Sequence, residues 1–180
     1  KRGGYFYITR YAEGKQYPIF CRTKNSAGAA EEVLLDQNDL ADGKSFCSVS
    51  GFAVSPDGTK LAYGVDFGGR ENYTLHIKDL TNGKLYLEAI ENTLGSAYEH
   101  FGVEWGNDSK TIFYVTLNDS QRPEKLFRHA LGTDPKQDVL IFHEEDETFF
   151  LYFHKTRDDA YIMTHHIATN TREIRFLSAD

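Results

Sequence analysis

The sequence predicts an all-β fold, a partial β-propeller of about three and a half blades with four antiparallel strands each. Three observations predict it. A turn-and-strand motif recurs about every 50 residues, short apolar segments follow turn-forming clusters, and aromatic residues make up 14% of the chain. Aromatic rings suit half-buried pleated surfaces. Long amphipathic helical patterns are missing from the sequence, which disfavours an α/β fold.

The first repeated motif is a turn cluster followed by a short apolar strand. Its copies occupy residues 55–63, 106–114 and 155–163, so they begin 51 and then 49 residues apart. Asp57, at the first turn, bonds its own backbone readily, and the glycine after it tolerates positive φ. Asp108 and Asp158 recur at the equivalent turns. One carboxylate per turn predicts turn chemistry rather than a calcium site, which needs six to eight oxygens.

A second set of apolar segments tests the same spacing independently. These segments lie at residues 19–21, 75–77, 126–128 and 174–176, and they are 56, 51 and 48 residues apart. The earlier strand at residues 5–7 precedes residues 61–63 by 56 residues, so the two sets agree within one residue. The repeat therefore divides the chain into units at approximately 1–48, 49–98, 99–147 and 148–180.

The second unit shows most clearly how four strands are expected to follow one another from the inside of a blade outward. We expect strands at residues 52–54, 61–65 and 73–78, and a fourth after the turn at 81–84. Asn82-Gly83 favours a hairpin because both positions tolerate positive φ. The innermost strands, which line the central channel of a propeller, are expected at 52–54, 103–105 and 149–154.

Only residues 36–41 look helical, with Asp36 or Asn38 available as a cap. The first unit lacks an innermost strand, and residues 1–4 resemble the end of a turn. The last unit stops after its third strand. Propellers close with four to eight blades. We therefore expect a piece of a longer protein, and the alternative is a small closed ring of four blades.

Charge and composition exclude several classes of function. The formal net charge of −7 disfavours nucleic-acid binding, which needs a basic face. Neither a membrane-spanning apolar run nor a secretory signal is visible, so no membrane partner is expected. Cys21 and Cys47 are expected to be buried and reduced. His165 and His166 point to opposite faces of a strand, so we expect neither a metal site nor a cofactor.

Six blocks of the sequence carry a resemblance to a known family, and they lie at residues 31–36, 52–57, 105–109, 126–133, 144–150 and 171–177. They resemble the propeller of the oligopeptidase B group, in the prolyl oligopeptidase family of serine peptidases. The resemblance runs over essentially the whole chain in the same order, which is more specific than one shared turn motif.

This resemblance implies a cytoplasmic peptidase that cuts short peptides after Arg or Lys. Its chemistry would lie in a C-terminal α/β-hydrolase domain, with a serine in a Gly-x-Ser-x-Gly turn. That motif does not occur in these 180 residues, so we assign no catalytic residue here. The propeller of this family covers the active site and restricts access to short peptides. The alternative is a freestanding propeller that binds a protein or peptide on one face.

Glu104, in an expected innermost strand, is the one candidate for contact with a basic substrate or with the hydrolase domain. It could equally be a structural charge paired with a neighbouring Arg or Lys. The acidic run at 144–147 could steer basic peptides toward a channel mouth, or it could be a solvated loop. Arg122 precedes a proline in an expected turn and could pair across domains.

Overall fold

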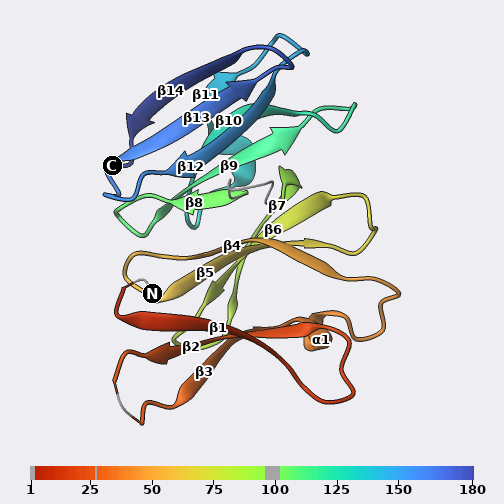
Figure 1. Ribbon diagram of the computed structural model, residues 1–180, viewed down its shortest axis with the longest axis vertical. Coiled ribbons are helices and arrows are strands. Elements are labelled where there is room, and N and C mark those ends of the chain that lie inside the picture. Colours follow the sequence, from red (N-terminus) through yellow and green to blue (C-terminus); the bar gives the residue numbers. More distant parts are fainter. Residues whose placement is uncertain (1–2, 27, 96–101) are drawn as a thin grey trace.

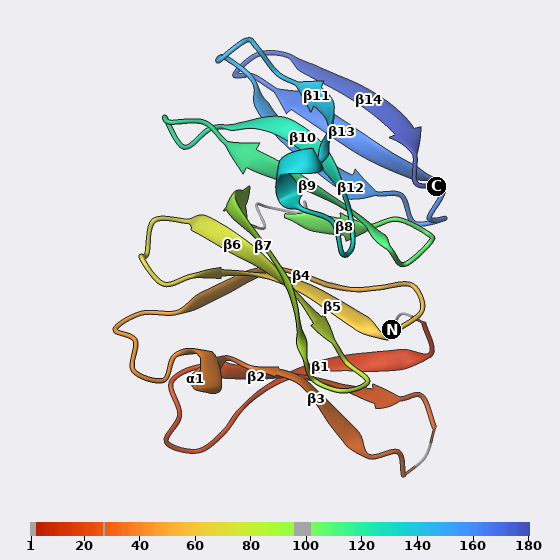
Figure 2. The same ribbon diagram turned by 180° about the vertical axis from the view of Figure 1, so that it is seen from behind.

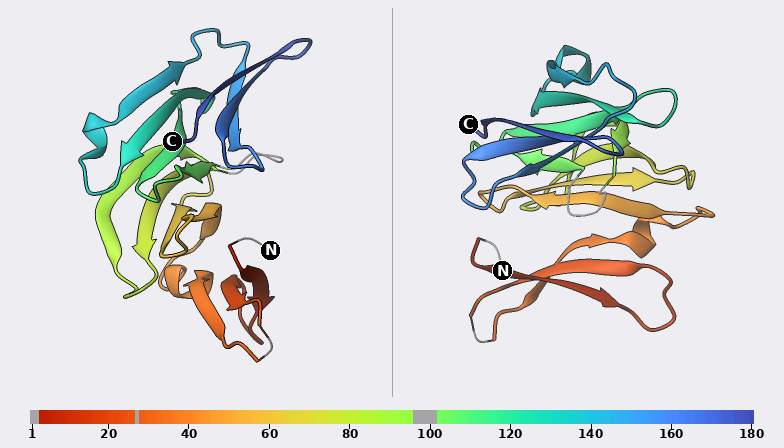
Figure 3. Two further views of the ribbon diagram at one scale, coloured as in Figure 1. Left: turned by 90° about the vertical axis from the view of Figure 1, so that its left-hand side faces the viewer. Right: turned by 45° about the horizontal axis from the view of Figure 1, so that its top comes forward.

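The computed structural model describes residues 3–26, 28–95 and 102–180, which form fourteen β-strands, one short α-helix and one 3-10 helix. Three antiparallel sheets follow each other in chain order along an arc (Figure 3, left). The strands are β1 (Tyr5–Tyr11), β2 (Pro18–Lys24), β3 (Glu31–Asp36), β4 (Ser48–Val54), β5 (Lys60–Asp66), β6 (Asn72–Asp79), β7 (Leu85–Leu94), β8 (Val103–Trp105), β9 (Thr111–Leu117), β10 (Pro123–Ala130), β11 (Val139–His143), β12 (Phe150–Lys155), β13 (Tyr161–Ile167) and β14 (Arg172–Ser178). The helices are α1 (Gln37–Leu40) and η1 (Pro135–Gln137).

The strand order confirms a partial β-propeller. The first sheet has the order β1-β2-β3 and the last has the order β12-β13-β14 (Figures 1 and 2). Between them, β4 to β7 and β8 to β11 each form an antiparallel four-stranded meander. Each unit thus packs its sheet face against the next one, as the blades of a propeller do.

Most of the expected strands are confirmed. In the second unit, the segments expected at 52–54, 61–65 and 73–78 lie within β4, β5 and β6. The inner strand expected at 103–105 is β8, and the one expected at 149–154 is β12, shifted by one residue. The turn clusters explain this accuracy, because they fix where each inner hairpin reverses.

The second and third units are more continuous than the repeat predicts. The outer strand β7 is ten residues long, and Thr93 pairs with Thr116 of β9. This one pair joins both units into a single eight-stranded sheet. The boundary expected at 98–99 lies outside the described residues, as do Lys1 and Arg2, and the other unit boundaries stay predictions.

The recurring aspartates cap turns, as predicted. The Asp57 carboxylate accepts hydrogen bonds from the backbone N–H of Thr59 (2.9 Å) and from the Ser55 hydroxyl (2.6 Å). Asp108 accepts from the backbone N–H of Lys110, and Asp158 plays the same part in the last unit. Successive turns also touch, because the N–H of Asp57 donates to the Ser109 hydroxyl.

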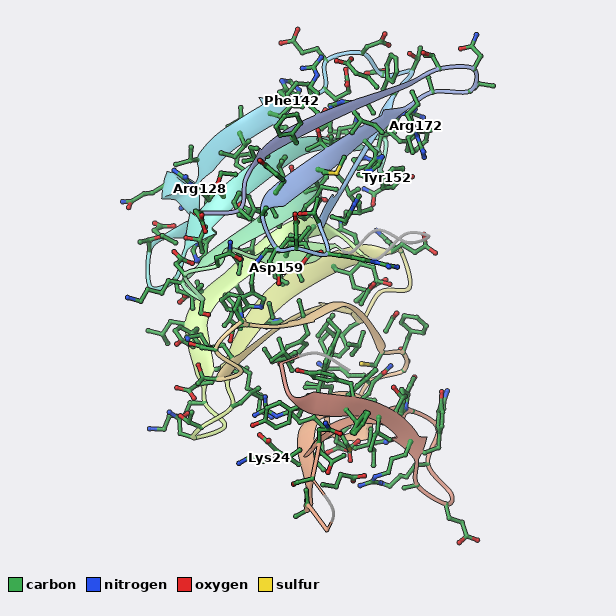
Figure 4. The ribbon with its side chains drawn as sticks, turned by 60° about the vertical axis from the view of Figure 1, so that its left-hand side comes forward. Lys24, Arg128, Phe142, Tyr152, Asp159 and Arg172 are labelled. Atoms are coloured by element: carbon green, nitrogen blue, oxygen red, sulfur yellow. The ribbon has the colours of Figure 1, made fainter. Side chains whose placement is uncertain are left out.

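Three apolar clusters fill the spaces within and between the sheets. The side-chain view places Lys24 and Tyr152 in the two outer sheets, with the β4–β7 sheet between them (Figure 4). The first junction holds Leu34, Leu35, Cys47, Leu61, Tyr63 and Val65; the middle holds Ala62, Leu75, Ile77, Ile90, Val103, Trp105, Ile112 and Tyr114; the last junction holds Phe113, Val115, Leu126, Leu151, Phe153, Ile162 and Ala179.

The predicted helical turn is α1. The Asp36 side chain caps it by accepting a hydrogen bond from the backbone N–H of Asn38 at 2.8 Å. Neither α1 nor η1 has the length or the apolar character to cross a membrane, and the described residues contain no other helix. Both cysteines, Cys21 and Cys47, are buried free thiols.

The two adjacent histidines of β13 do point to opposite faces. His165 Nε2 lies 3.1 Å from Nδ1 of His154, whereas His166 Nδ1 lies 2.7 Å from Oε2 of Glu144 on the other side. The interpretation of the acidic run as a solvated loop is therefore correct only in part. Glu145 fits it, because its side chain is 87% exposed. The Glu144 side chain does not, because it contacts His166 and is only 14% exposed.

Candidate functional site

A cavity of about 480 Å³ is lined by residues of the strands β1, β2, β4 and β8. Its wall is mainly apolar and aromatic, and Glu104 is the one charged side chain in it. The side chains that shape it most are Tyr7, Ile8, Phe20, Phe52, Val54 and Glu104. An apolar hollow with few polar groups is the usual character of a ligand site.

A bulge in β4 shapes one wall of the cavity. The β4–β5 register shifts between Ser50 and Ala53, and Gly51 adopts a φ of +58° there. An added residue bends a strand and changes the direction of the next side chain, and glycine accepts the positive φ without strain. Phe52 then stacks on Phe20 of β2, with ring centroids 4.9 Å apart. The first two units therefore meet at this wall.

Glu104 reaches the cavity because side chains alternate along β8. Its neighbours Val103 and Trp105 are buried in the middle apolar cluster, so the carboxylate points to the opposite side. Glu104 is itself buried, and its Oε1 accepts a hydrogen bond from the backbone N–H of Lys155 at 3.0 Å. Lys155 is thus the predicted cationic neighbour, but its main chain rather than its ammonium group makes this bond.

Contacts on both sides hold β8 in place. The Trp105 indole N–H donates to the carbonyl oxygen of Ala53 at 2.9 Å, which ties β8 to β4. On the other side, the Lys155 ammonium donates to the Trp105 carbonyl at 3.0 Å. Glu104 therefore occupies a fixed position between the second and the last unit.

The single carboxylate beside apolar side chains has the chemistry that suits a cation, and the one thiol in the wall is that of Cys21. Burial raises the pKa of the Cys21 thiol, as does the nearby Glu31. Cys21 therefore stays protonated at neutral pH, and a thiol is a poor nucleophile compared with a thiolate. Within the described part of the chain, no three His, Cys, Asp or Glu side chains are grouped as a metal site.

The sequence predicted that Glu104 lies in an innermost strand, but it did not predict which other residues line the cavity. Tyr7 and Phe20 belong to strands expected outside the channel, so no spacing argument could bring them to β8. Of the expected innermost strands, β12 contributes no residue to the cavity wall.

Arg122 and the acidic run lie elsewhere, around a smaller hollow of about 240 Å³. There the Arg122 guanidinium covers the Phe150 ring at 3.8 Å. This cation–π contact lies inside the chain, so it gives Arg122 a structural role.

Comparisons with known proteins agree with this architecture. Residues 1–180 match the family described as prolyl oligopeptidase, N-terminal β-propeller domain. The chain is 36% identical to Protease 2 of Moraxella lacunata, covering 100% of this chain and 26% of that protein. It is 34% identical to dipeptidyl aminopeptidase BI of Pseudoxanthomonas mexicana, covering 96% of this chain and 25% of that protein.

Among solved structures, oligopeptidase B from Leishmania major superposes with a TM-score of 0.92 at 30% identity, covering 99% of this chain and 25% of that one. The chain therefore spans about a quarter of the length of the relatives that it matches. These relatives are named as peptidases.

Proposed function

Because the chain belongs to the family of prolyl oligopeptidase N-terminal β-propeller domains, we propose that it is the non-catalytic, substrate-gating part of a serine oligopeptidase. The enzyme would hydrolyse short peptides after Arg or Lys. Its partner would be a C-terminal α/β-hydrolase domain of the same polypeptide, which supplies the nucleophilic serine. Similarity to Protease 2 and to oligopeptidase B along nearly the whole chain supports this assignment.

The observation that carries the specificity is the single carboxylate of Glu104 in the apolar wall of the inner cavity. A carboxylate in a site of low dielectric attracts a cation more strongly than one in water. The aromatic side chains of Phe20 and Phe52 beside it can cover the methylene groups of an Arg or Lys side chain. We assign Glu104 to contact with the cationic substrate or with the hydrolase domain.

The overall charge supports the same substrate class. The formal net charge is −7, and a negative field raises the encounter rate with cationic peptides, most strongly at low salt. The buried free thiols of Cys21 and Cys47 suit a reducing compartment, so we propose that the enzyme works in the cytoplasm.

Steady-state kinetics of the complete polypeptide that contains this chain test the role of Glu104. We expect Glu104→Gln to raise KM for an Arg-Arg peptide about tenfold. We expect kcat to change little, because the group binds but does not react. The amide keeps an oxygen for the Lys155 N–H, so the fold is retained. Glu145→Gln, at an exposed carboxylate, is the matched control and leaves KM unchanged.

The outcomes separate the two roles of Glu104. A tenfold rise confined to Glu104→Gln supports substrate contact. An equal loss on peptides with and without Arg indicates a contact with the hydrolase domain. No change in either parameter would remove Glu104 from the proposal, and the charge would then be structural.

A further inference from the structure

A second groove lies on the outer side of the arc, away from Glu104. It has a volume of about 590 Å³ and runs between the start of β7 and the loop that follows β10. Figure 3 (left) shows β7 on the convex side of the arc, whereas β4 and β8 lie toward the inside. One wall is formed by residues 85–88 and the other by residues 132–135.

The β7 wall ends in an open strand edge. Leu85, Ala89 and Ile90 pair with β6, and the only pairing of β7 with β9 in the described residues is at Thr93. Backbone N–H and C=O groups along the first part of β7 therefore face outward. An open edge of this kind is a template for another extended chain.

The side chains on this edge protect it only in part. Leu87 is fully exposed and Leu85 is 54% exposed. Exposed edge strands usually carry lysine, proline or an inward charge, which prevent pairing with other chains. The first half of β7 has no lysine or proline, and its one charged side chain, Glu88, points inward and is 6% exposed. Leu85 and Leu87 at alternate positions offer apolar contacts to an added strand.

The groove is acidic. Three carboxylates line it, those of Asp79, Glu88 and Asp134, against one ammonium group, that of Lys84. Hydrogen bonds from the Thr81 hydroxyl and backbone lower the pKa of Asp79, so this group stays charged at neutral pH. A partner with positive charge is therefore favoured over a neutral or acidic one.

The two walls are held in place from below. Glu88 Oε1 accepts a hydrogen bond from the backbone N–H of Gly132 at 2.8 Å, which connects β7 to the opposite loop. Beneath it, His129 is completely buried. Its Nδ1 lies 2.7 Å from Oδ1 of Asp138, and Oδ2 of the same carboxylate accepts a hydrogen bond from the Tyr114 hydroxyl.

The other nitrogen of His129 points at the groove. Nε2 is buried without a hydrogen-bond partner, and it lies 3.8 Å from Oε1 of Glu88 in the groove wall. A buried polar atom without a partner is costly in a folded protein, so this nitrogen marks the base of the groove as a site of unusual polarity.

We propose that the open edge of β7 and its acidic groove bind an extended segment of a partner protein, with Lys or Arg alternating with apolar residues. The segment adds one strand to the sheet at β7. Its main chain bonds the open edge, its apolar side chains contact Leu85 and Leu87, and its cations meet Asp79 and Asp134. Glu88, whose side chain is 6% exposed, adds negative charge beneath the groove. Strand addition of this type gives affinity through the main chain and specificity through alternate side chains.

Fluorescence anisotropy with the complete polypeptide tests this inference. The probe is a fluorescein-labelled Lys-Leu-Lys-Leu-Lys-Leu peptide, and a fluorophosphonate first blocks any serine nucleophile so that the peptide stays intact. We expect a Kd on the order of 100 µM, typical of a small transient contact. Leu87→Lys is expected to weaken binding at least about tenfold, because it adds a like charge to the edge.

The controls isolate the edge and the charge. Val33→Lys, on the outer strand β3 where the residue is 48% exposed, keeps full binding. A peptide N-methylated at alternate residues and a Glu-Leu peptide both fail to bind. Equal binding by the Leu87→Lys variant or by the N-methylated peptide would overturn the proposal, as would the lack of saturable binding below about 1 mM.

One further result has a defined meaning. Dimers that form in sedimentation and disappear in Leu87→Lys would overturn the partner assignment, because a second copy would then occupy the edge. The outcome does not depend on peptidase activity, so it stands apart from the test of Glu104.

Discussion

The first and the last junction between units each contain a buried cation that bonds the neighbouring unit, but the two cations have different partners. At the N-terminal junction, between β1–β3 and β4–β7, Arg22 donates to the carbonyl of Gly58 in the neighbouring turn at 2.7 Å. At the C-terminal junction, between β8–β11 and β12–β14, Lys155 donates to the carbonyl of Trp105 at 3.0 Å. In both junctions the cation bonds a backbone carbonyl of the neighbouring unit, in or beside the turn that follows β4 or β8.

The two cations differ in how they are neutralised. Arg22 makes a two-point contact with its own carboxylate, Glu32, at 2.7 and 2.9 Å. The Lys155 ammonium bonds neutral oxygens, including the Asn107 amide oxygen at 2.5 Å, and its ion pair with Asp159 spans 3.7 Å. Arg22 therefore keeps its two-point contact with Glu32 of the same unit when the junction opens. Lys155 keeps the longer contact with Asp159 of its own unit but loses its hydrogen bonds to Trp105 and Asn107 of the neighbouring unit.

This difference predicts the largest effect at Lys155. We expect Lys155→Met to destabilise the C-terminal junction by about 3 kcal/mol, because the buried Trp105 carbonyl and the Asn107 amide oxygen both lose a charged donor. Hydrogen–deuterium exchange of the complete polypeptide measures this locally, as roughly 100-fold faster exchange in β12 and β8. Lys84→Met, at an exposed turn, is the control. Unchanged exchange in β12 would show that the apolar cluster alone holds the junction.

A smaller effect is expected at Arg22. Arg22→Met leaves Glu32 with a side chain that is already 41% exposed, so water can solvate the released carboxylate. We expect a loss of about 1.5 kcal/mol, which corresponds to roughly tenfold faster exchange in β2. A loss as large as that for Lys155→Met would contradict the distinction drawn between the two cations.

The smallest effect concerns the turn that Arg22 contacts. Burial alone would raise the pKa of the Asp57 carboxyl. Hydrogen bonds from Lys60 and Ser55 outweigh this effect and hold the pKa well below its ordinary value. The folded state therefore binds fewer protons here than the unfolded state, so stability is present at neutral pH and falls as the pH drops below about 4.

Asp57→Asn is expected to cost about 1 kcal/mol at pH 7, since the turn is partly exposed and solvent screens the charge. This cost should start to shrink below about pH 4 and should shrink further toward about pH 2, as the folded carboxylate also becomes protonated. Thermal unfolding midpoints measured from about pH 2 to pH 7 check this. A variant whose deficit stays the same over that range would show that the carboxylate charge does not stabilise the turn.

The sequence could predict the features of this fold that repeat. Turn clusters and apolar segments located the strands of the second unit and the short strand β8, because local chemistry fixes where a hairpin reverses. The pairing of Thr93 with Thr116 joins two units, and no local pattern encodes it. The 3-10 helix η1 was missed, although Asp134 before Pro135 is a recognisable capping sequence.

The candidate site was predicted in part for the same reason. The repeat placed Glu104 in an innermost strand, and the structure shows its side chain on the side opposite Val103 and Trp105. Its cavity wall comes from Tyr7 and Phe20, which lie more than 80 residues earlier in the sequence, and only the folded arc brings them near. The burial of Glu144 could not be predicted for the same reason, because its carboxylate contacts His166 across the last junction.

The most direct test of the central claim is activity labelling in the natural source. A lysate is treated with a fluorophosphonate that reacts with serine hydrolases, and labelled bands are identified by peptides from this chain. We predict a labelled band much larger than 20.5 kDa, with labelling that an Arg-Arg peptide competes away. Peptides found only in an unlabelled band near 20.5 kDa would contradict the account and favour a freestanding binding propeller.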